Sequence, residues 1–211
     1  VEPLITDLVK SFAGKELLSE EIPRIPFIEA MEKYGTDKPD LRYSMELVDL
    51  TDVVRESSFG VFANAIKEGG CVKAITVKGA KSLSRSNIDS FTDIARAEGA
   101  GGMAYIMIED GKPVSPITKF FTEDELKNII SKTGAKDDDG IFFAVGNRNL
   151  VNKVLGRLRV EFADHFGLKD PNIVALAWIV DFPFYEWDDK ENKLEFGHNP
   201  FSMPKGGLEG L

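Results

Sequence analysis

Cysteine is nearly absent from this sequence, which has Cys71 alone among its 211 residues. A single cysteine cannot form an intrachain disulfide or a thiolate metal cluster, so a reducing, cytoplasmic setting is expected. Cys71 opens a run of mostly apolar residues, and no general base lies beside it in the sequence. It is therefore expected to fill space in a buried strand rather than to act as a nucleophile.

Histidine is almost as scarce, with His165 and His198 as the two examples. No Gly-x-Ser-x-Gly segment is present, which excludes the nucleophile elbow of a catalytic triad, and the histidines have no neighbouring metal ligands. His165 falls near the end of a predicted helix, where its simplest role is a favourable interaction with the helix dipole. No catalytic residue and no metal ligand is assigned.

Positive charge and long apolar runs are lacking as well. The 35 Asp and Glu residues outnumber the 26 Lys and Arg residues, and the net charge is −9. Tight phosphate binding needs clustered cations, so the chain alone is expected to bind nucleic acid weakly or not at all. No run approaches the roughly 18–20 apolar residues of a transmembrane helix, so no membrane partner is expected. Without a Gly-x-x-x-x-Gly-Lys loop, no nucleotide cofactor is expected on this chain.

A long apolar run does occur near the end of the chain, at residues 173–180. About eight apolar residues bounded by turn residues predict a strand that is buried on both faces. An aromatic ribbon follows at 181–187, and the turn at 188–192 predicts a hairpin that leads to His198 and Asn199. The hairpin is expected to present these two polar side chains at the end of a sheet.

His198 and Asn199 are the candidate binding residues, because an imidazole beside an amide offers donors suited to a carboxylate or an amide. The alternative is a histidine that is held at a hairpin end and binds nothing. The stretch 35–42 places four charges around a proline, which is typical of a solvated loop with local ion pairs. Spacing assigns no role to Lys38 or Arg42.

The middle of the chain, residues 57–170, has the pattern strand, helix, hairpin, helix, strand, helix. This order predicts a self-contained α+β unit. Its first strand, at 72–77, is expected to have one wet face. Ser84 and Thr122 are expected to cap two of its helices, because each precedes an amphipathic helical pattern.

The apolar run 173–180 has more in common with the segments before residue 57 than with the middle unit. We therefore expect an insert at 57–170 within a host domain, whose flanks are 1–56 and 171–211. The chain opens with valine rather than methionine and ends in a glycine-rich stretch without a closing element. Both ends look cut, which predicts an internal piece of a longer protein.

Three stretches of the flanks carry recognisable motifs, namely Tyr-Gly-Thr-Asp-Lys-Pro-Asp-Leu-Arg at 34–42, Ile-Val-Asp-Phe-Pro-Phe-Tyr-Glu at 179–186 and His-Asn-Pro-Phe-Ser-Met-Pro at 198–204, and the marks of the middle unit lie at 72–74, 83–85, 115–120 and 155–159. The three stretches, taken in order, resemble the bacterial-type aspartyl-tRNA synthetases, which are class II ligases. The middle unit is similar to the insertion (GAD) domain of that family and of the B subunit of tRNA-dependent amidotransferases. The resemblance spans essentially the whole chain and implies an α+β fold, with an antiparallel-sheet class II catalytic-core fragment interrupted by an α+β insertion domain.

The resemblance implies that the parent protein joins L-aspartate to tRNA with the use of ATP and Mg²⁺, as a cytoplasmic homodimer. In the family, the first residue of the His-x-Pro-Phe motif contacts the amino-acid substrate, which corresponds to His198. Many relatives have a second histidine where this chain has Asn199. An amide can replace one imidazole hydrogen bond, but it cannot carry the charge.

The family's motifs 1, 2 and 3 and its anticodon-binding domain are not in this chain, so the resemblance implies that the isolated chain is inactive. One alternative is a tRNA- or protein-binding module related to the amidotransferase B subunit. That subunit would share the insert but not the flanking motifs at 181–183 and 198–201. A third hypothesis, an unrelated metabolic enzyme, would require a small-molecule pocket wholly within the insert.

Overall fold

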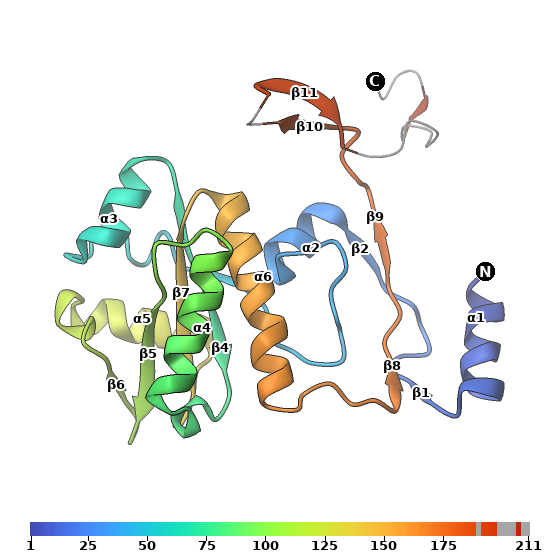
Figure 1. The fold of residues 1–211 in the computed structure, drawn as a ribbon, viewed down its shortest axis with the longest axis horizontal. Coiled ribbons are helices and arrows are strands. Elements are labelled where there is room, and N and C mark those ends of the chain that lie inside the picture. The colour runs from blue at the N-terminus through green and yellow to red at the C-terminus, as the bar shows by residue number, and fades with distance from the viewer. Residues whose placement is uncertain (189–190, 198–205, 208–211) are drawn as a thin grey trace.

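The structure is a computed structural model that describes residues 1–188, 191–197 and 206–207. Figure 1 shows an elongated molecule, with a sheet and its helices at one end and helix α1 at the other. The helices are α1 (Glu2–Leu8), α2 (Phe27–Tyr34), α3 (Gly60–Lys67), α4 (Arg85–Ala97), α5 (Glu123–Thr133) and α6 (Arg148–His165). The strands are β1 (Glu16–Leu17), β2 (Arg24–Pro26), β3 (Val48–Asp49), β4 (Cys71–Val77), β5 (Ala104–Glu109), β6 (Lys112–Val114), β7 (Gly140–Gly146), β8 (Ile173–Val174), β9 (Trp178–Val180), β10 (Tyr185–Asp188) and β11 (Lys193–Phe196).

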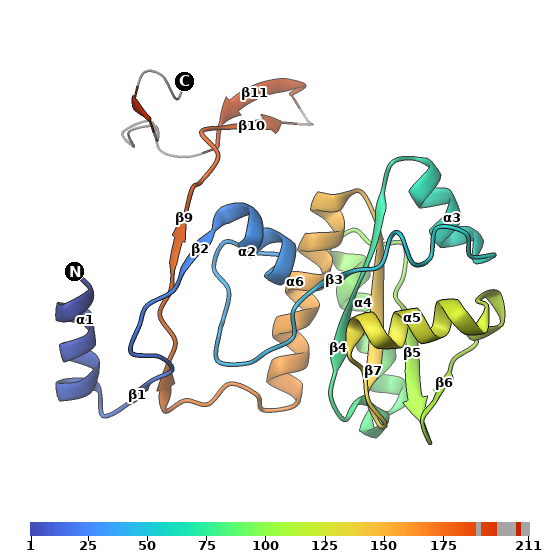
Figure 2. The same cartoon turned by 180° about the vertical axis from the view of Figure 1, so that it is seen from behind.

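The largest sheet has five antiparallel strands in the order β3-β4-β7-β5-β6. Helices α4 and α6 cover one face and α3 and α5 cover the other, as the two opposite views show (Figures 1 and 2). Side chains alternate between the faces of a strand. Accordingly, Cys71 and Ile75 join the core under α4 and α6, while Val72 and Ala74 join the core under α3 and α5.

Strand β4 does not have the wet face that was predicted for residues 72–77. Six of its seven residues are buried, including Lys73, which is 0% exposed. The expectation was wrong because helix α6, which lies far along the sequence, covers the face on which Lys73 stands. The predicted helix caps are confirmed, since Ser84 with Asn87 and Thr122 with Glu125 form reciprocal capping boxes.

The two ends of the chain lie side by side, as expected for flanks of one host domain. Strand β1 pairs with β8, and β2 pairs with β9, both in parallel. The predicted single strand at 173–180 is wrong, because this run forms two short strands and none of its residues is fully buried. Each of these strands pairs with one neighbour among the described residues, so its other edge is open and Trp178 is 38% exposed.

The five-stranded antiparallel sheet lies mainly in the middle unit. The two flanks pair with each other through parallel strands, and the C-terminal flank adds the antiparallel hairpin β10–β11, so the place of the flanks in a class II catalytic sheet stays a prediction. The five-stranded sheet also includes β3, and Leu50 and Val54 lie in its core. These residues precede position 57, and the domain limits at 56 and 170 likewise stay predictions. None of the helices in the described ranges has the length and hydropathy that a membrane span requires.

Helices α2 and α6 meet through their backbones at Gly35 and Gly156. Gly35 ends α2 with a φ of 70°, which favours glycine. A Cβ on Gly35 would lie 2.1 Å from the carbonyl oxygen of Asn152, and one on Gly156 would lie 2.8 Å from the carbonyl oxygen of Gly35. Two glycines therefore allow the N-terminal flank to pack directly on the middle unit.

Gly156→Ala is expected to destabilise the chain by about 1–3 kcal/mol, because the added methyl group overpacks this contact. Helix propensity alone predicts the opposite sign, a gain of roughly 1 kcal/mol. The matched control is Gly60→Ala in the first turn of α3, where a Cβ would meet nothing within 4 Å. Urea unfolding of both variants measures the difference, and equal stability of the two would contradict the close approach.

Candidate site at the junction of helix α2, helix α6 and the C-terminal hairpin

The predicted binding residues His198 and Asn199 lie outside the described residues. The hairpin that leads to them is described, and its strands β10 and β11 pair from Tyr185↔Phe196 to Asp188↔Lys193. The amide of Gly197 donates to the carbonyl oxygen of Phe184 at 3.1 Å, which closes the hairpin just before His198. The chain is therefore described up to Gly197, the residue before His198.

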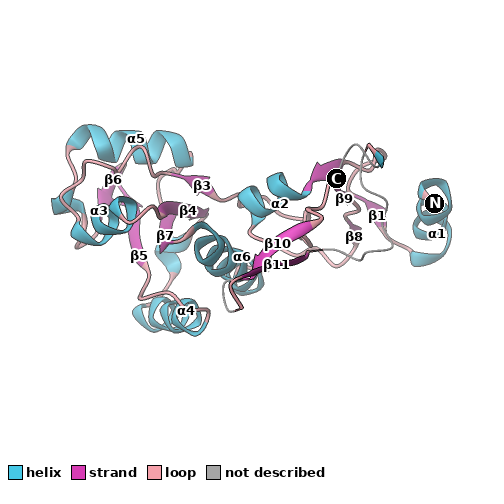
Figure 3. Cartoon of the chain, turned by 90° about the horizontal axis from the view of Figure 1, so that it is seen from above, coloured by secondary structure: helices cyan, strands magenta, loops and turns pink. Residues whose placement is uncertain are grey.

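This hairpin borders a cleft of about 460 Å³. The views from the front and from above place the hairpin beside α2 and the start of α6 (Figures 1 and 3). Aromatic and apolar side chains share the walls of the cleft with two carboxylates and a guanidinium group. Such a mixture is typical of small-molecule sites. The lining residues are Phe27, Ile28, Met31 and Glu32 of α2, Arg148, Asn149 and Asn152 of α6, and Pro183, Glu186 and Trp187 of the C-terminal flank.

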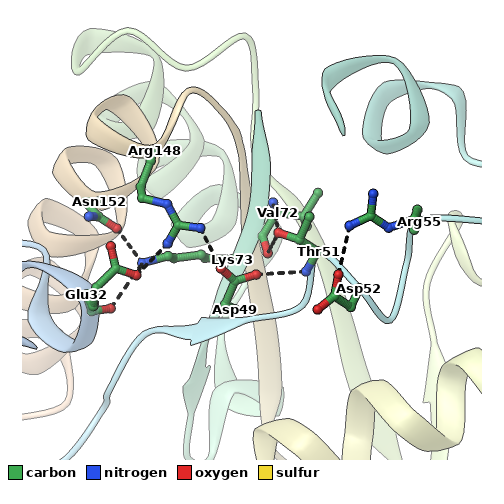
Figure 4. A network of polar contacts seen from close by, with 9 residues as sticks. All are labelled: Glu32, Asp49, Thr51, Asp52, Arg55, Val72, Lys73, Arg148 and Asn152. Atoms are coloured by element: carbon green, nitrogen blue, oxygen red, sulfur yellow. Dashed lines mark hydrogen bonds and ion pairs between the residues drawn. The ribbon is translucent and has the colours of Figure 1, made fainter. Parts of the chain in front are cut away.

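Two residues that line the cleft, Glu32 and Asn152, bind a buried amine. Figure 4 shows the Nζ of Lys73 reaching from β4 to two other elements. It donates to Oε2 of Glu32 at 2.7 Å, to the carbonyl oxygen of Glu32 at 3.2 Å and to Oδ1 of Asn152 at 2.8 Å. Burial of a charge is unfavourable unless it is paired and hydrogen-bonded. All three acceptors of this ammonium group come from α2 and α6, so it joins both helices to the sheet.

Arg148 extends the network towards solvent. Its guanidinium donates to Oε2 of Glu32 at 2.6 Å and to Oδ2 of Asp49 at 3.2 Å. The other oxygen of Asp49 accepts from the amide of Thr51 at 2.9 Å. Two cations thus face two carboxylates, which balances the charge of the network, and its members come from α2, β3, β4 and α6.

The pKa values follow from this arrangement. Burial raises the pKa of Glu32, but the hydrogen bond from Lys73 and the charges of Lys73 and Arg148 outweigh it and hold the pKa below its ordinary value. Burial likewise raises the pKa of Asp49, while hydrogen bonds from Thr51 and the charge of Arg148 bring it below the usual value. Both carboxylates are therefore ionised at neutral pH.

A second buried cation, Arg159 of α6, holds the loop that contains the 34–42 stretch. Its guanidinium donates to the carbonyl oxygens of Asp40 at 2.8 Å, Tyr43 at 3.0 Å and Met45 at 3.0 Å. The rings of Tyr34 and Tyr43 lie 5.0 and 4.2 Å from it. Burial lowers the pKa of Arg159, since its acceptors are neutral carbonyl groups.

Within the 34–42 stretch, Arg42 has a structural role. It pairs with Asp40 at 2.6 Å and donates to the carbonyl oxygen of Asp170 at 3.2 Å, so it ties the loop to the start of the C-terminal flank. The hydrogen bond from Arg42 lowers the pKa of Asp40. Lys38 pairs with Asp37, and its side chain is 82% exposed. The stretch is thus partly a solvated loop with local ion pairs, as the spacing indicated, but it is anchored by α6.

The polar network was not predicted from the sequence, although one signal was available. Lys73 interrupts the apolar run of β4, and a lysine in a central strand needs a buried partner. Its partners Glu32 and Asn152 lie 41 and 79 residues away, so spacing could not identify them. Among the residues that the structure describes, no group of His, Cys, Asp or Glu is arranged to hold a metal ion.

The sequence is similar to those of known proteins. Residues 62–155 match the family model of the GAD domain. The chain is 41% identical over 213 residues to the aspartate–tRNA(Asp/Asn) ligase of Novosphingobium aromaticivorans, covering all of the chain and 36% of that protein. For the ligase of the same name from Aquifex aeolicus the identity is 43% over 204 residues, with 97% and 34% covered. For the aspartate–tRNA ligase of Streptomyces avermitilis it is 42% over 212 residues, with 100% and 35% covered.

The chain therefore spans about a third of the length of the relatives that it matches. The predicted resemblance to bacterial aspartyl-tRNA synthetases is confirmed, and a GAD domain lies in the middle of the chain, as predicted.

Removal of one partner from the network is expected to cost more than removal of the buried charge itself. Glu32→Ala leaves Lys73 buried without its carboxylate and should cost about 2–3 kcal/mol, less than a fully buried pair because Glu32 is partly exposed. Lys73→Met removes the charge and fills the volume, so it should cost less than about 1.5 kcal/mol. Urea unfolding of both variants at pH 7 measures this order, and a larger loss in Lys73→Met would contradict it.

Acid is expected to weaken the same contact. The pKa of Glu32 lies below its ordinary value of 4.5 in the folded chain, so its contribution to stability is complete above that value. The contribution is lost as the pH falls through the folded pKa. In Glu32→Gln, the loss of unfolding free energy between pH 6 and pH 3 should therefore be smaller than in the parent chain. Parallel pH profiles would show that Glu32 is not held by Lys73 and Arg148.

Proposed function

We propose that this chain, which matches about a third of several bacterial aspartate–tRNA ligases along its whole length, is a segment of such an enzyme. The parent protein activates L-aspartate with ATP and transfers the aspartyl group to tRNA. The observation that carries the proposal is the identity of 41–43% across both flanks and the GAD domain, rather than across the insert alone.

The geometry supports a catalytic-domain role for the flanks. Strands β1 and β2 from one flank pair with β8 and β9 from the other, which supports a single host domain that the middle unit interrupts. The hairpin β10–β11 leaves this host beside the cleft and leads to His198 and Asn199. We place these two residues at the aspartate carboxylate, where each would donate a hydrogen bond.

The rest of the chemistry would lie in the remainder of the parent protein. Aspartyl-adenylate formation requires ATP and Mg²⁺, and the transfer requires cations that stabilise charge on the α-phosphate. In the proposed parent, a cytoplasmic homodimer, the present chain would supply part of the amino-acid site and the insert. Residues 34–42, clamped by Arg159, would lie on the same host domain.

The isolated chain is expected to show no aspartate-dependent exchange between ATP and pyrophosphate and no charging of tRNA. The cations that would bind ATP are assigned to parts of the parent that this chain does not include, and its net charge of −9 disfavours phosphate binding. Both assays should be run beside the complete ligase as a positive control. Activity of the chain alone above the level of a heat-denatured sample would refute the assignment of the ATP-binding cations to other parts of the parent.

In the complete ligase, His198→Ala is expected to raise the KM for aspartate by roughly 10–100-fold, as the loss of a hydrogen bond to a charged group predicts. Asn199→Ala should raise it by roughly 2–10-fold, because a neutral amide contributes less. Exchange kinetics at varied aspartate and fixed ATP measure both, with the KM for ATP as the control. An unchanged KM for aspartate in His198→Ala would refute the assignment.

A further inference from the structure

A second cavity, of about 350 Å³, lies wholly within the middle unit and shares no residue with the cleft. It opens at the end of the sheet where α3 approaches the segment that leads into β5. No charged or hydroxyl side chain lines it, which argues against a polar metabolite as its ligand. Its walls are Phe59, Val61, Phe62, Gly101, Gly102, Met103, Ala104, Ile117, Phe143 and Val145.

The aromatic wall of this cavity is part of the core. The ring of Phe62, which is 1% exposed, packs 4.8 Å from Phe59 and 5.5 Å from Phe143. Phe59 also stacks on Phe120 at 5.3 Å. Val61 at the edge is 56% exposed. The cavity is therefore a preformed apolar recess whose entrance faces solvent.

Strand β7 exposes one pair of backbone groups at this cavity. The amide of Leu50 donates to the carbonyl oxygen of Val72, so the backbone groups of Val72 point away from β7 and those of Cys71 point towards it. Cys71 lies opposite Gly146, and alternation then directs the N–H and C=O of Val145 to the other side of β7, where β5 runs.

Strand β5 begins at Ala104 and does not extend far enough to pair with the N–H and C=O of Val145. Its first residue, Ala104, lies opposite Phe143, and the same register would bring Gly102 opposite Val145. Instead, Gly101 and Gly102 line the cavity, and no backbone hydrogen bond joins them to Val145 within this described part of the chain. An unpaired edge beside an apolar recess is a template for strand addition.

We propose that this site binds one extended residue of a partner polypeptide, with a Leu-sized apolar side chain. In an antiparallel pair, a residue opposite Val145 exchanges both backbone hydrogen bonds with it. Directly opposite residues also have their side chains on the same face of the sheet. The residue that pairs with Val145 therefore directs its own side chain into the recess between Phe62, Phe143 and Ala104. One extended residue would therefore pair with the backbone groups of Val145 and also fill the apolar recess. A purely apolar ligand could fill the recess but could not form the hydrogen bonds.

The test is an NMR titration of the ¹⁵N-labelled chain with the peptide acetyl-Gly-Ser-Leu-Ser-Gly-amide. Weak, saturable binding in the millimolar range is expected, with shifts at the amides of Val145, Gly101 and Gly102. N-methylation of the leucine removes the donor and should weaken binding roughly 2–10-fold, the range for one hydrogen bond. Replacement of the leucine by alanine should weaken it by roughly tenfold or more, because the recess is left unfilled.

Two variants at the recess and one control variant complete the design. Ala104→Leu fills the recess and should abolish the shifts, and Val61→Glu at its edge should weaken them. Val114→Glu is the matched control, because Val114 is 46% exposed on β6 and does not line the recess. It should bind the peptide as the parent chain does.

Several outcomes would overturn the proposal. Equal affinity for the N-methylated peptide would show apolar adhesion without strand addition. Shifts that map to other residues, or none at 10 mM peptide, would show that the recess takes no extended segment. Concentration-dependent shifts of the same amides without peptide would identify a second copy of the chain as the occupant. The proposal does not depend on ligase activity, so its failure and that of the proposed function are distinguishable.

Discussion

The burial of one charged amine places the strongest constraint on this structure. Lys73 stands in the middle of a central strand, where a charge is tolerated when it is paired and fully hydrogen-bonded. Its acceptors come from Glu32 on α2 and Asn152 on α6. These two helices must therefore meet over β4. The N-terminal flank cannot move away from the middle unit without leaving an ammonium group unpaired in a nonpolar environment.

Helix α6 carries the other parts of the same junction. Gly156 allows the backbone of α6 to contact Gly35, and Arg159 donates to three carbonyl groups of the loop that follows α2. Arg148, one turn before Asn152, links Glu32 to Asp49. The four residues lie along one helix, so their effects are coupled. The cleft beside the C-terminal hairpin has this junction as one wall, and its shape depends on the docking of α6.

Much of the local structure could be predicted from the sequence, because its signals are short-range. The caps at Ser84 and Thr122 depend on residues within a few positions of each other. The flanking motifs and the change in pattern near residue 57 also led to the expectation that the two ends lie together, and strands of the two ends do pair. The division into an insert and a host stays a prediction.

The misses share a physical origin, which is the contribution of distant segments. The wet face expected for β4 is covered by α6, and the single buried strand expected at 173–180 has too few neighbours to be buried. The Lys73 network joins residues up to 79 positions apart, and no local pattern encodes such a contact. At the candidate site, the junction that forms one wall could therefore not be predicted from the sequence, and the binding role of His198 and Asn199 stays a prediction.

The side-chain nitrogen of Lys73 offers the most direct measurement of this account. In ¹⁵N spectra that detect lysine ammonium groups, exposed lysines such as Lys38 exchange their protons with water rapidly, and a buried, triply hydrogen-bonded ammonium exchanges slowly. A slowly exchanging signal is expected for Lys73, and its loss in Lys73→Met would assign it. The exchange of its protons with water should be faster in Glu32→Ala. A Lys73 signal that exchanges as fast as that of Lys38 would contradict the docking of α2 and α6 on a buried amine.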